Sequence, residues 1–191
     1  QEGILIPPVK LFEAGVLKSD IVAILSANSR LPNSLYGDMN AQINALDLGH
    51  QRLADLLDEY GETDVSAALK LLRQRADRMM RDHLAALPDG TISVEDYLDN
   101  DGVNDDVLTL AVDMTISEDR LTIDFSRSSP ACAGPVNISR STTIAATYVA
   151  LKHIFTDVPA NAGVLLPVKF IIPEESFLSV TAPKPVGGYT E

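Results

Sequence analysis

Two different spacings of hydrophobic residues divide the sequence. Up to about residue 90 the apolar side chains recur every three or four positions, which is typical of helices that bury one face. The first such segment predicts a short helix that begins at Ser19–Asp20, a favourable cap, and runs to about Asn28. Pro32 is expected to end it, because the residue before a proline disfavours helical geometry.

Two longer helices are predicted next, over 34–60 and 63–87. Gly61 is expected to close the first and Pro88–Gly90 to turn the chain after the second. Their apolar stripes are Met39, Ile43, Leu46, Leu53 and Leu57, then Leu69, Leu72, Ala76, Met79 and Leu87. Because a very short loop joins them, we expect an antiparallel helical hairpin.

From Thr91 onward the apolar residues alternate with polar ones, as they do in strands. The clearest pair, 108–116 and 121–126, predicts a β-hairpin whose apolar faces match when Ile116 lies opposite Leu121. A helix over 141–155, a buried strand over 164–172 and a short strand over 177–180 are expected to follow. The sequence therefore predicts an α+β fold, with a helical region over 1–90 and a mixed region over 91–191.

The same hairpin register places two carboxylates, Asp113 and Asp124, directly opposite each other. Opposed like charges destabilise a sheet unless water, a cation or a proton intervenes. If the face is solvated, the pair has no further role. If another part of the protein covers it, the pair becomes a candidate cation or general-base site.

Composition narrows the function classes. The net charge is −12, with 27 acidic against 15 basic residues, which disfavours nucleic acids and anionic membranes as partners. No apolar run is long enough to span a membrane, and the first residues do not resemble a signal peptide. The single cysteine, Cys132, excludes an internal disulfide and suits the reducing cytoplasm.

Several common active-site patterns are absent from the sequence. His50 and His83 would be separated by about 13 Å along the hairpin axis, too far to share a metal ion, so each is expected to have a local partner instead. His153 also lacks a second ligand at suitable spacing. The serines at 126–129 do not lie in a Gly-x-Ser-x-Gly elbow, and Cys132 has no identifiable base. No phosphate-binding glycine loop is present, so any ATP would bind elsewhere.

Short motifs along the whole chain resemble one protein family. The sequence Asp-Phe-Ser-Arg-Ser-Ser-Pro at 124–130, followed by Gly-Pro-Val-Asn at 134–137, is similar to the signature of the hydantoinase B/5-oxoprolinase family. Other family-like motifs lie at 6–11, 37–42, 87–90, 157–163 and 187–191. One departure is Arg127, where the family usually has glycine, so a close backbone approach at that position is not expected here.

The resemblance implies the B-type subunit of an ATP-dependent hydrolase that opens a hydantoin, 5-oxoproline or other lactam ring. An A-type subunit would hold ATP and Mg²⁺, and a zinc or manganese ion would be held by a region before Gln1. Because family members are longer at both ends, the chain is expected to be an internal piece with an incomplete active site. Related members are ketone carboxylases, so the reaction stays open, and a non-catalytic assembly domain that pairs with the A-type subunit is the second hypothesis.

Four residues are candidates for the site. Asp38 and Asp124 are predicted catalytic groups, and Gln42 and Asn137 are predicted substrate-binding groups. Asp38 is expected at the start of a helix, where it either stabilises the helix dipole or projects with Gln42, one turn later, toward a substrate or an interface. Asn137 precedes the helix after the signature and suits either a cap or a substrate amide partner.

Overall fold

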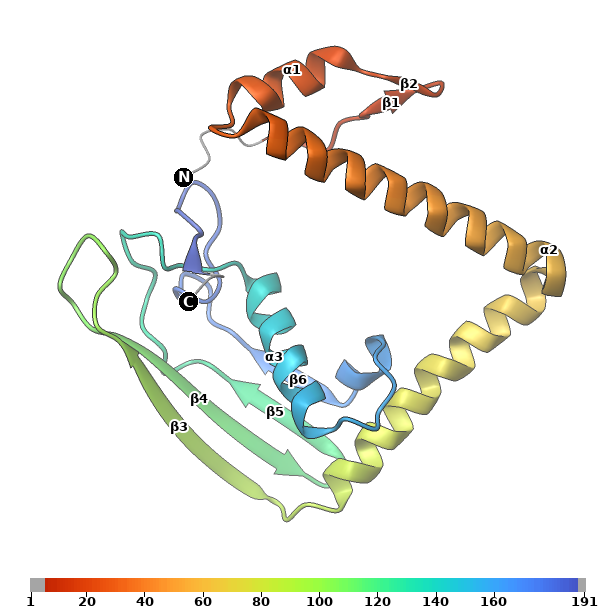
Figure 1. The fold of residues 1–191 in the computed structure, drawn as a ribbon. Helices are drawn as coiled ribbons and strands as arrows, with labels where there is room; N and C mark the ends of the chain where they lie inside the picture. The colour runs from red at the N-terminus through yellow and green to blue at the C-terminus, as the bar shows by residue number, and fades with distance from the viewer. Residues whose placement is uncertain (1–5, 189–191) are drawn as a thin grey trace. The chain divides into compact units, whose positions relative to one another are not determined.

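The computed structural model describes residues 6–188 and divides the chain into two compact units (Figure 1). One unit ends at Val65 and the other begins at Ser66. Each is described below by itself.

The N-terminal unit begins with a two-stranded hairpin, β1 (Phe12–Glu13) and β2 (Val16–Leu17), followed by helix α1 (Ser19–Ala27). The predicted helix is thus confirmed, but its predicted cap is wrong: Lys18 occupies the N-cap and makes no side-chain bond there. Asn28 closes α1 by donating from Nδ2 to the carbonyl of Ile24 at 2.7 Å.

The long helix α2 (Pro32–Ala85) starts earlier than predicted. Pro32 does not end α1 but forms the first residue of α2, where its fixed φ and missing N–H are favourable. Gly61 breaks the helix, with φ 79° and ψ 155°, so the predicted interruption at this glycine is confirmed. The halves on either side belong largely to different units, and their antiparallel packing stays a prediction.

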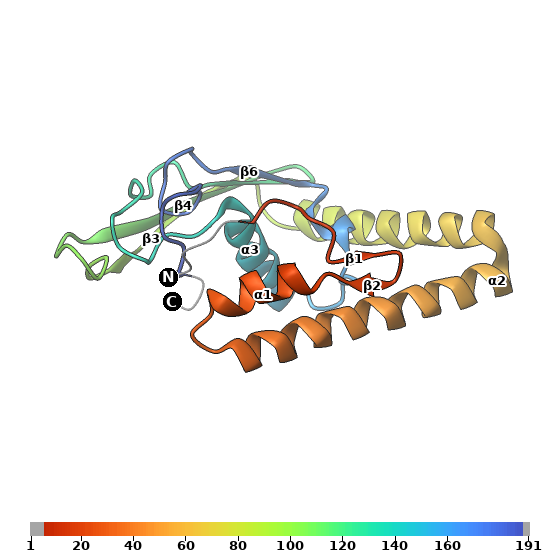
Figure 2. The same cartoon turned by 90° about the horizontal axis from the view of Figure 1, so that it is seen from above.

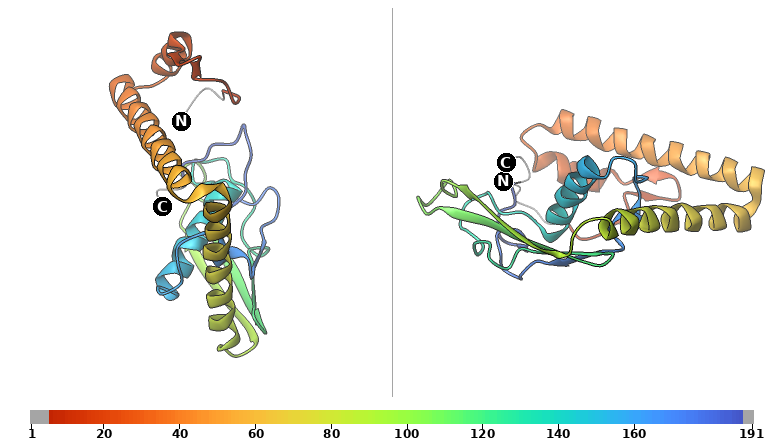
Figure 3. Two further views of the ribbon diagram at one scale, coloured as in Figure 1. Left: turned by 90° about the vertical axis from the view of Figure 1, so that its right-hand side faces the viewer. Right: turned by 90° about the horizontal axis from the view of Figure 1, so that it is seen from below.

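A four-stranded sheet of order β3-β4-β5-β6 forms the second unit. Strands β3 (Gly90–Leu98), β4 (Leu108–Ser117) and β5 (Arg120–Asp124) are antiparallel, and β6 (Val168–Ile171) runs parallel to β5. The crossover to β6 contains α3 (Arg140–Ile154) and a 3₁₀ turn, η1 (Ala162–Leu165). Helix α3 lies on one face of the sheet (Figures 2 and 3).

The predicted β-hairpin has the predicted register: Ile116 pairs with Leu121, and Asp113 pairs with Asp124. The helix predicted over 141–155 is α3, shifted by one residue. Ser139 caps it by accepting a hydrogen bond from the backbone N–H of Thr142. The α+β class is confirmed.

Two strand predictions need correction. Over 164–172 the chain first forms η1 and reaches β6 only after Pro167, whose ring cannot donate to a ladder. Over 177–180 there is no strand, although Phe177, Leu178 and Val180 are buried. Glu175, with φ 65°, turns the chain just before this segment. The apolar residues alone predict a strand here, because they do not report this turn.

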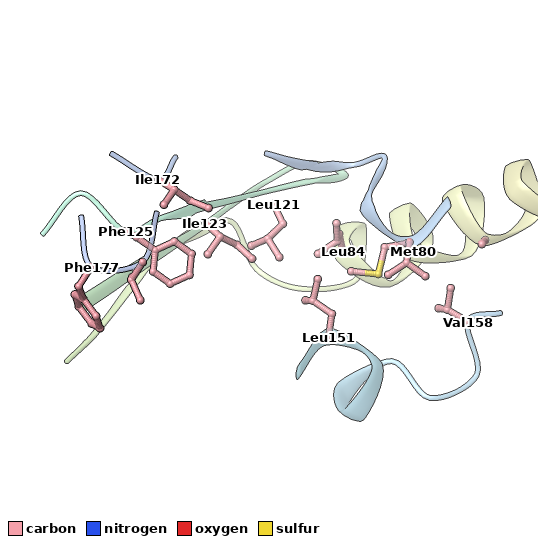
Figure 4. Close-up of a cluster of buried hydrophobic side chains, with 12 residues drawn as sticks. Met80, Leu84, Leu121, Ile123, Phe125, Leu151, Val158, Ile172 and Phe177 are labelled. Carbon is pink, nitrogen blue, oxygen red and sulfur yellow. The ribbon is translucent and has the colours of Figure 1, made fainter. Parts of the chain in front are cut away.

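The core of the second unit contains side chains from the sheet and from two helices, α2, which precedes β3 in the sequence, and α3, which follows β5 (Figure 4). It contains Met80 and Leu84 from α2, Leu121, Ile123 and Phe125 from β5 and the residue after it, and Leu151 from α3. The end of α2 therefore belongs to this unit, although the sequence changes from helical to strand-like only at residue 90. As domains, the predicted regions 1–90 and 91–191 stay a prediction.

Candidate functional site

The segment that follows β5, residues 126–137, is called the signature loop here. Its serines take over the pairing of β4 where β5 has ended. Ser128 Oγ accepts from the N–H of Ala111 at 3.0 Å and donates to its carbonyl at 2.8 Å. Ser129 Oγ accepts from the N–H of Thr109 at 2.8 Å, and the Ser129 N–H donates to the Thr109 carbonyl at 2.9 Å. Both hydroxyls thus satisfy the edge of a strand, which agrees with the absence of a serine-nucleophile motif.

A buried carboxylate holds the middle of the signature loop. Asp101 is only 2% exposed, and its oxygens accept from backbone N–H groups of two segments. Val103 and Asn104 donate to Oδ1 at 2.8 and 2.6 Å, and Ala133 and Gly134 donate to Oδ2 at 3.1 and 3.0 Å. These bonds, led by that from Asn104, lower the pKa of Asp101 to about 2.

Asn137 closes the same loop from within the protein. It is fully buried, and its Oδ1 accepts from the N–H of Cys132 at 2.9 Å. Its Nδ2 lies 3.1, 2.9 and 3.2 Å from the carbonyl oxygens of Cys132, Gly134 and Pro185, to which it donates. Its own carbonyl accepts from the N–H of Gly188 at 3.2 Å. Both the oxygen and the nitrogen of the Asn137 side-chain amide are therefore bonded to protein backbone.

Two glycines permit these close contacts. A Cβ at position 134 would lie 1.7 Å from the carbonyl oxygen of Asp101, and one at position 188 would lie 2.0 Å from that of Val136. Neither backbone could stay in place with a larger residue, so the glycines of the 134–137 and 187–191 motifs have a steric explanation. The last three residues of the second motif, 189–191, lie outside the described residues.

Arg127 explains how the sheet tolerates the opposed carboxylates. Its guanidinium binds Asp113 in a two-pronged pair, with Nε and Nη2 at 3.0 and 2.9 Å from the two carboxylate oxygens, and it also contacts Glu95. The hydrogen bond from Arg127 is the main reason that the pKa of Asp113 is lowered. A cation thus intervenes on this face of the sheet. Asp124 makes a different contact, since its Oδ1 accepts from the Ser126 N–H at 2.8 Å.

The four predicted site residues fall into two pairs. Asp124 is the last residue of β5, just before the signature loop, and Asn137 is the last residue of that loop, both in the second unit. Asp38 and Gln42 lie one turn apart, both exposed, on the part of α2 that belongs to the N-terminal unit. Because α2 begins at Pro32, Asp38 is in its second turn and not at its start, so the helix-dipole interpretation of Asp38 is wrong.

One open hollow is lined by the signature loop, and a second, larger one shares part of its wall. The smaller, about 370 Å³, is lined by Ser126, Ser128, Pro130 and the 173–176 turn. The larger, about 980 Å³, extends to Arg140 and Ser141 at the start of α3. Glu174, Glu175 and Lys184 line both, so the walls carry charges of either sign.

The prediction of a partner is confirmed for His83 but not for His50, which is exposed on α2 and to whose side chain no bond is found within residues 6–188. His83 has a local partner, since its Nε2 lies 2.9 and 3.0 Å from the two carboxylate oxygens of Asp157, and its ring lies against Phe155. His153 Nδ1 contacts the carbonyl of Val149 within α3. Within residues 6–188, no three His, Cys, Asp or Glu side chains are grouped as metal ligands. The helices in this range include none with the length and apolar character of a membrane span.

Sequence reasoning missed the roles of Asp101 and of the 157–163 motif. The Asn100-Asp101-Gly102 run carried a turn signal that could have indicated a side chain bonded to its own backbone. Asn161 accepts from the Gly163 N–H at 2.8 Å and donates to the Leu72 carbonyl at 3.3 Å, which ties the motif to α2. The second of these contacts joins residues far apart in sequence and has no local signal.

Comparison with known proteins identifies the family. The profile of the Hydantoinase B/oxoprolinase family matches residues 1–191. The chain belongs to this family. It is 32% identical over 196 residues to the B-type subunit of a putative D-/L-hydantoinase from Pseudomonas sp. (strain NS671), covering 96% of this chain and 33% of that protein. It is 34% identical over 158 residues to the beta subunit of the caprolactamase from Pseudomonas jessenii, covering 83% of this chain and 27% of that protein.

Solved structures support the same assignment. The crystal structure of the ATP-dependent caprolactamase from Pseudomonas jessenii matches 97% of this chain and 32% of its own with a TM-score of 0.85 at 30% identity. A nucleotide-free acetone carboxylase structure matches 98% of this chain and 27% of its own, also with a TM-score of 0.85, but at 15% identity it shows the fold alone. This member of the hydantoinase B family thus spans about a third of the length of the curated relatives named above.

Proposed function

We propose that this hydantoinase B family chain is part of the B-type subunit of an ATP-dependent cyclic-amide hydrolase. The observation that carries the proposal is the match, over 97% of the chain, to the crystal structure of an ATP-dependent caprolactamase. The similarity to a putative hydantoinase gives the same reaction class with a different ring. We therefore propose a lactam or hydantoin as substrate, without preference between them.

In this proposal Asp124 is the general base or cation-binding group of the second unit. The bond from the Ser126 N–H orients its carboxylate through Oδ1, and no bond to Oδ2 is found within residues 6–188. A carboxylate held by one oxygen can use the other toward a proton or a ring nitrogen. Asp38 is proposed as the second catalytic group, with Gln42 one turn away as its substrate-binding neighbour.

Asn137 keeps its proposed contact to substrate only if the signature loop opens. Its Oδ1 and Nδ2 have backbone partners in the closed loop, so binding of a ring amide would exchange these bonds for substrate bonds.

The cofactors are proposed to lie outside the described residues. The sequence contains no phosphate loop, so ATP and Mg²⁺ are assigned to an A-type partner subunit. No suitable group of metal-ligating side chains is found within residues 6–188. Zinc or manganese, if required, would therefore need ligands from outside this range. The cytoplasm is the proposed location, because the only cysteine is a free thiol.

The test uses the full-length B-type subunit assembled with its A-type partner. ATP-dependent ring opening is measured on caprolactam, 5-oxoproline and N-methylhydantoin, with carboxylation of acetone as the alternative reaction. The variants are Asp124→Ala and Asp38→Ala, and Asp106→Ala, an exposed carboxylate outside the site, is the control. We expect the first two to lose at least about 100-fold in turnover, as is usual for general acid–base groups, while the control keeps its activity.

One observation favours the second candidate, an assembly domain without reacting groups. Arg127 neutralises Asp113, and the Asn137 amide is satisfied by the protein, so two of the polar groups near the loop are already engaged. Unchanged turnover in Asp124→Ala and Asp38→Ala, with the complex intact by light scattering, would support this role and reject the catalytic one.

A further inference from the structure

The buried contact between two loops points to a residue that positions the signature loop. Asp101 lies 32 and 33 positions before Ala133 and Gly134, yet its Oδ2 accepts from both of their N–H groups. Its Oδ1 meanwhile accepts from Val103 and Asn104 within its own turn. One carboxylate therefore fixes two backbone segments at once.

The contact is specific for a carboxylate in this orientation. All of the four backbone groups that face it are N–H donors, which match the acceptor-only character of an ionised aspartate. An asparagine at this position would turn an NH₂ group toward at least one N–H. The absence of a Cβ at Gly134 brings the loop backbone close enough, because a Cβ there would lie 1.7 Å from the Asp101 carbonyl oxygen.

The same network of hydrogen bonds includes Asn137, at the end of the signature loop. Gly134 donates to Asp101 through its N–H and accepts from Asn137 Nδ2 through its carbonyl. Asn137 in turn holds Cys132 and the carbonyl of Pro185. A change in the Asp101 carboxylate thus reaches Asn137 through a single residue, Gly134.

We propose that Asp101 is the positioning residue of the signature loop, setting the backbone of 132–137 and, through it, the amide of Asn137. The effect of Asp101 on turnover rests on the proposed function. The effect of Asp101 on the backbone of the loop does not.

Cys132 is a built-in reporter of the loop, because it is the only cysteine of the chain and its thiol contacts Asn137 Oδ1 at 3.3 Å. Burial is the main cause of its raised pKa, and the charge of Asp101 adds to it. The rate of alkylation by iodoacetamide is measured from pH 6 to 10 in the 191-residue chain. The test variant is Asp101→Asn. The control is Asp105→Asn, which makes the same charge change at an exposed position of the segment between β3 and β4 that contains Asp101.

We expect Asp101→Asn to speed alkylation about tenfold, as loss of hydrogen bonds to a charged acceptor predicts, and to shift the pH profile to lower pH. Asp105→Asn should match the wild type. An unchanged rate and profile in folded Asp101→Asn would overturn the proposal. If that variant does not fold, hydrogen exchange in the wild type decides: protected N–H groups at Ala133 and Gly134 support the proposal, and exchange at the rate of an unfolded peptide refutes it.

The turnover assay then separates the two proposals. If the wild-type complex opens no ring, the proposed function fails while the alkylation result still stands. If wild-type turnover is present and Asp101→Asn retains it in full despite faster alkylation, the loop is positioned by Asp101 but the site does not depend on it, and the functional part of the inference is overturned.

Discussion

Replacement of Gly163 by alanine tests whether the 157–163 motif holds α2 by close backbone contact. A Cβ at this buried position would lie 2.1 Å from the carbonyl oxygen of Arg73 and 2.8 Å from Cβ of Ala76. Ordinary contacts require η1 and α2 to separate by about 1 Å, and this would open the core around Met80. Overpacking of this kind costs about 1–3 kcal/mol, and the upper end applies because the obstructing atom is backbone.

The control is the same substitution where the structure leaves room for it. Gly49 lies exposed within α2, and a Cβ there would meet no atom within 4 Å. Alanine should therefore stabilise the helix by about 0.5–1 kcal/mol. Urea unfolding followed by far-ultraviolet circular dichroism gives both values. If Gly163→Ala unfolds within about 0.5 kcal/mol of the wild type, the range of ordinary surface changes, the close-contact argument is wrong.

Three further predictions follow from single side chains. Met80→Ala should destabilise the second unit by about 2–5 kcal/mol, measured by urea unfolding, because Met80 is fully buried. Arg127→Ala should destabilise the second unit by no more than about 1 kcal/mol, because the ion pair is half-exposed, and should raise the pKa of Asp113, measured by NMR titration, because this cation holds that pKa down. Asp101 has a folded-state pKa of about 2 against an ordinary 3.8, so its contribution is complete above about pH 4 and is lost as pH falls through 2. The stabilities of wild type and Asp101→Asn should thus converge on acidification, and a constant difference from pH 6 to pH 2 would contradict this assignment.

Local patterns predicted the parts of the fold that local physics determines. Alternation over 108–126 gave the β4–β5 register, because a slip by one residue would expose the whole apolar face. Gly61 and the polar turn at 88–90 gave the ends of helical segments. The prediction of a strand over 177–180 is wrong because the segment is an irregular loop whose apolar side chains are buried. A short apolar run without alternation does not distinguish a strand from a buried loop.

Predictions for the site depended on contacts that sequence spacing does not report. The opposed pair Asp113 and Asp124 follows from register, but the cation that accompanies Asp113 comes from Arg127, 14 positions along the chain, and the strand pattern does not report this contact. The role of Asp101 depends on Ala133 and Gly134, which lie 32 and 33 positions away. No local period connects them.

The family motifs themselves divide by physical role once these contacts are known. Several of their residues hold backbone in place: Ser128 and Ser129 complete a strand edge, and the glycines at 134 and 163 allow backbones to approach. A residue that must act on a substrate needs an atom that the fold does not already use. Within the described part of the signature, Asp124 meets this condition, because a single backbone N–H orients it while its second oxygen keeps no bond within residues 6–188. This uncommitted oxygen, more than membership of the motif, is the reason to test Asp124 first.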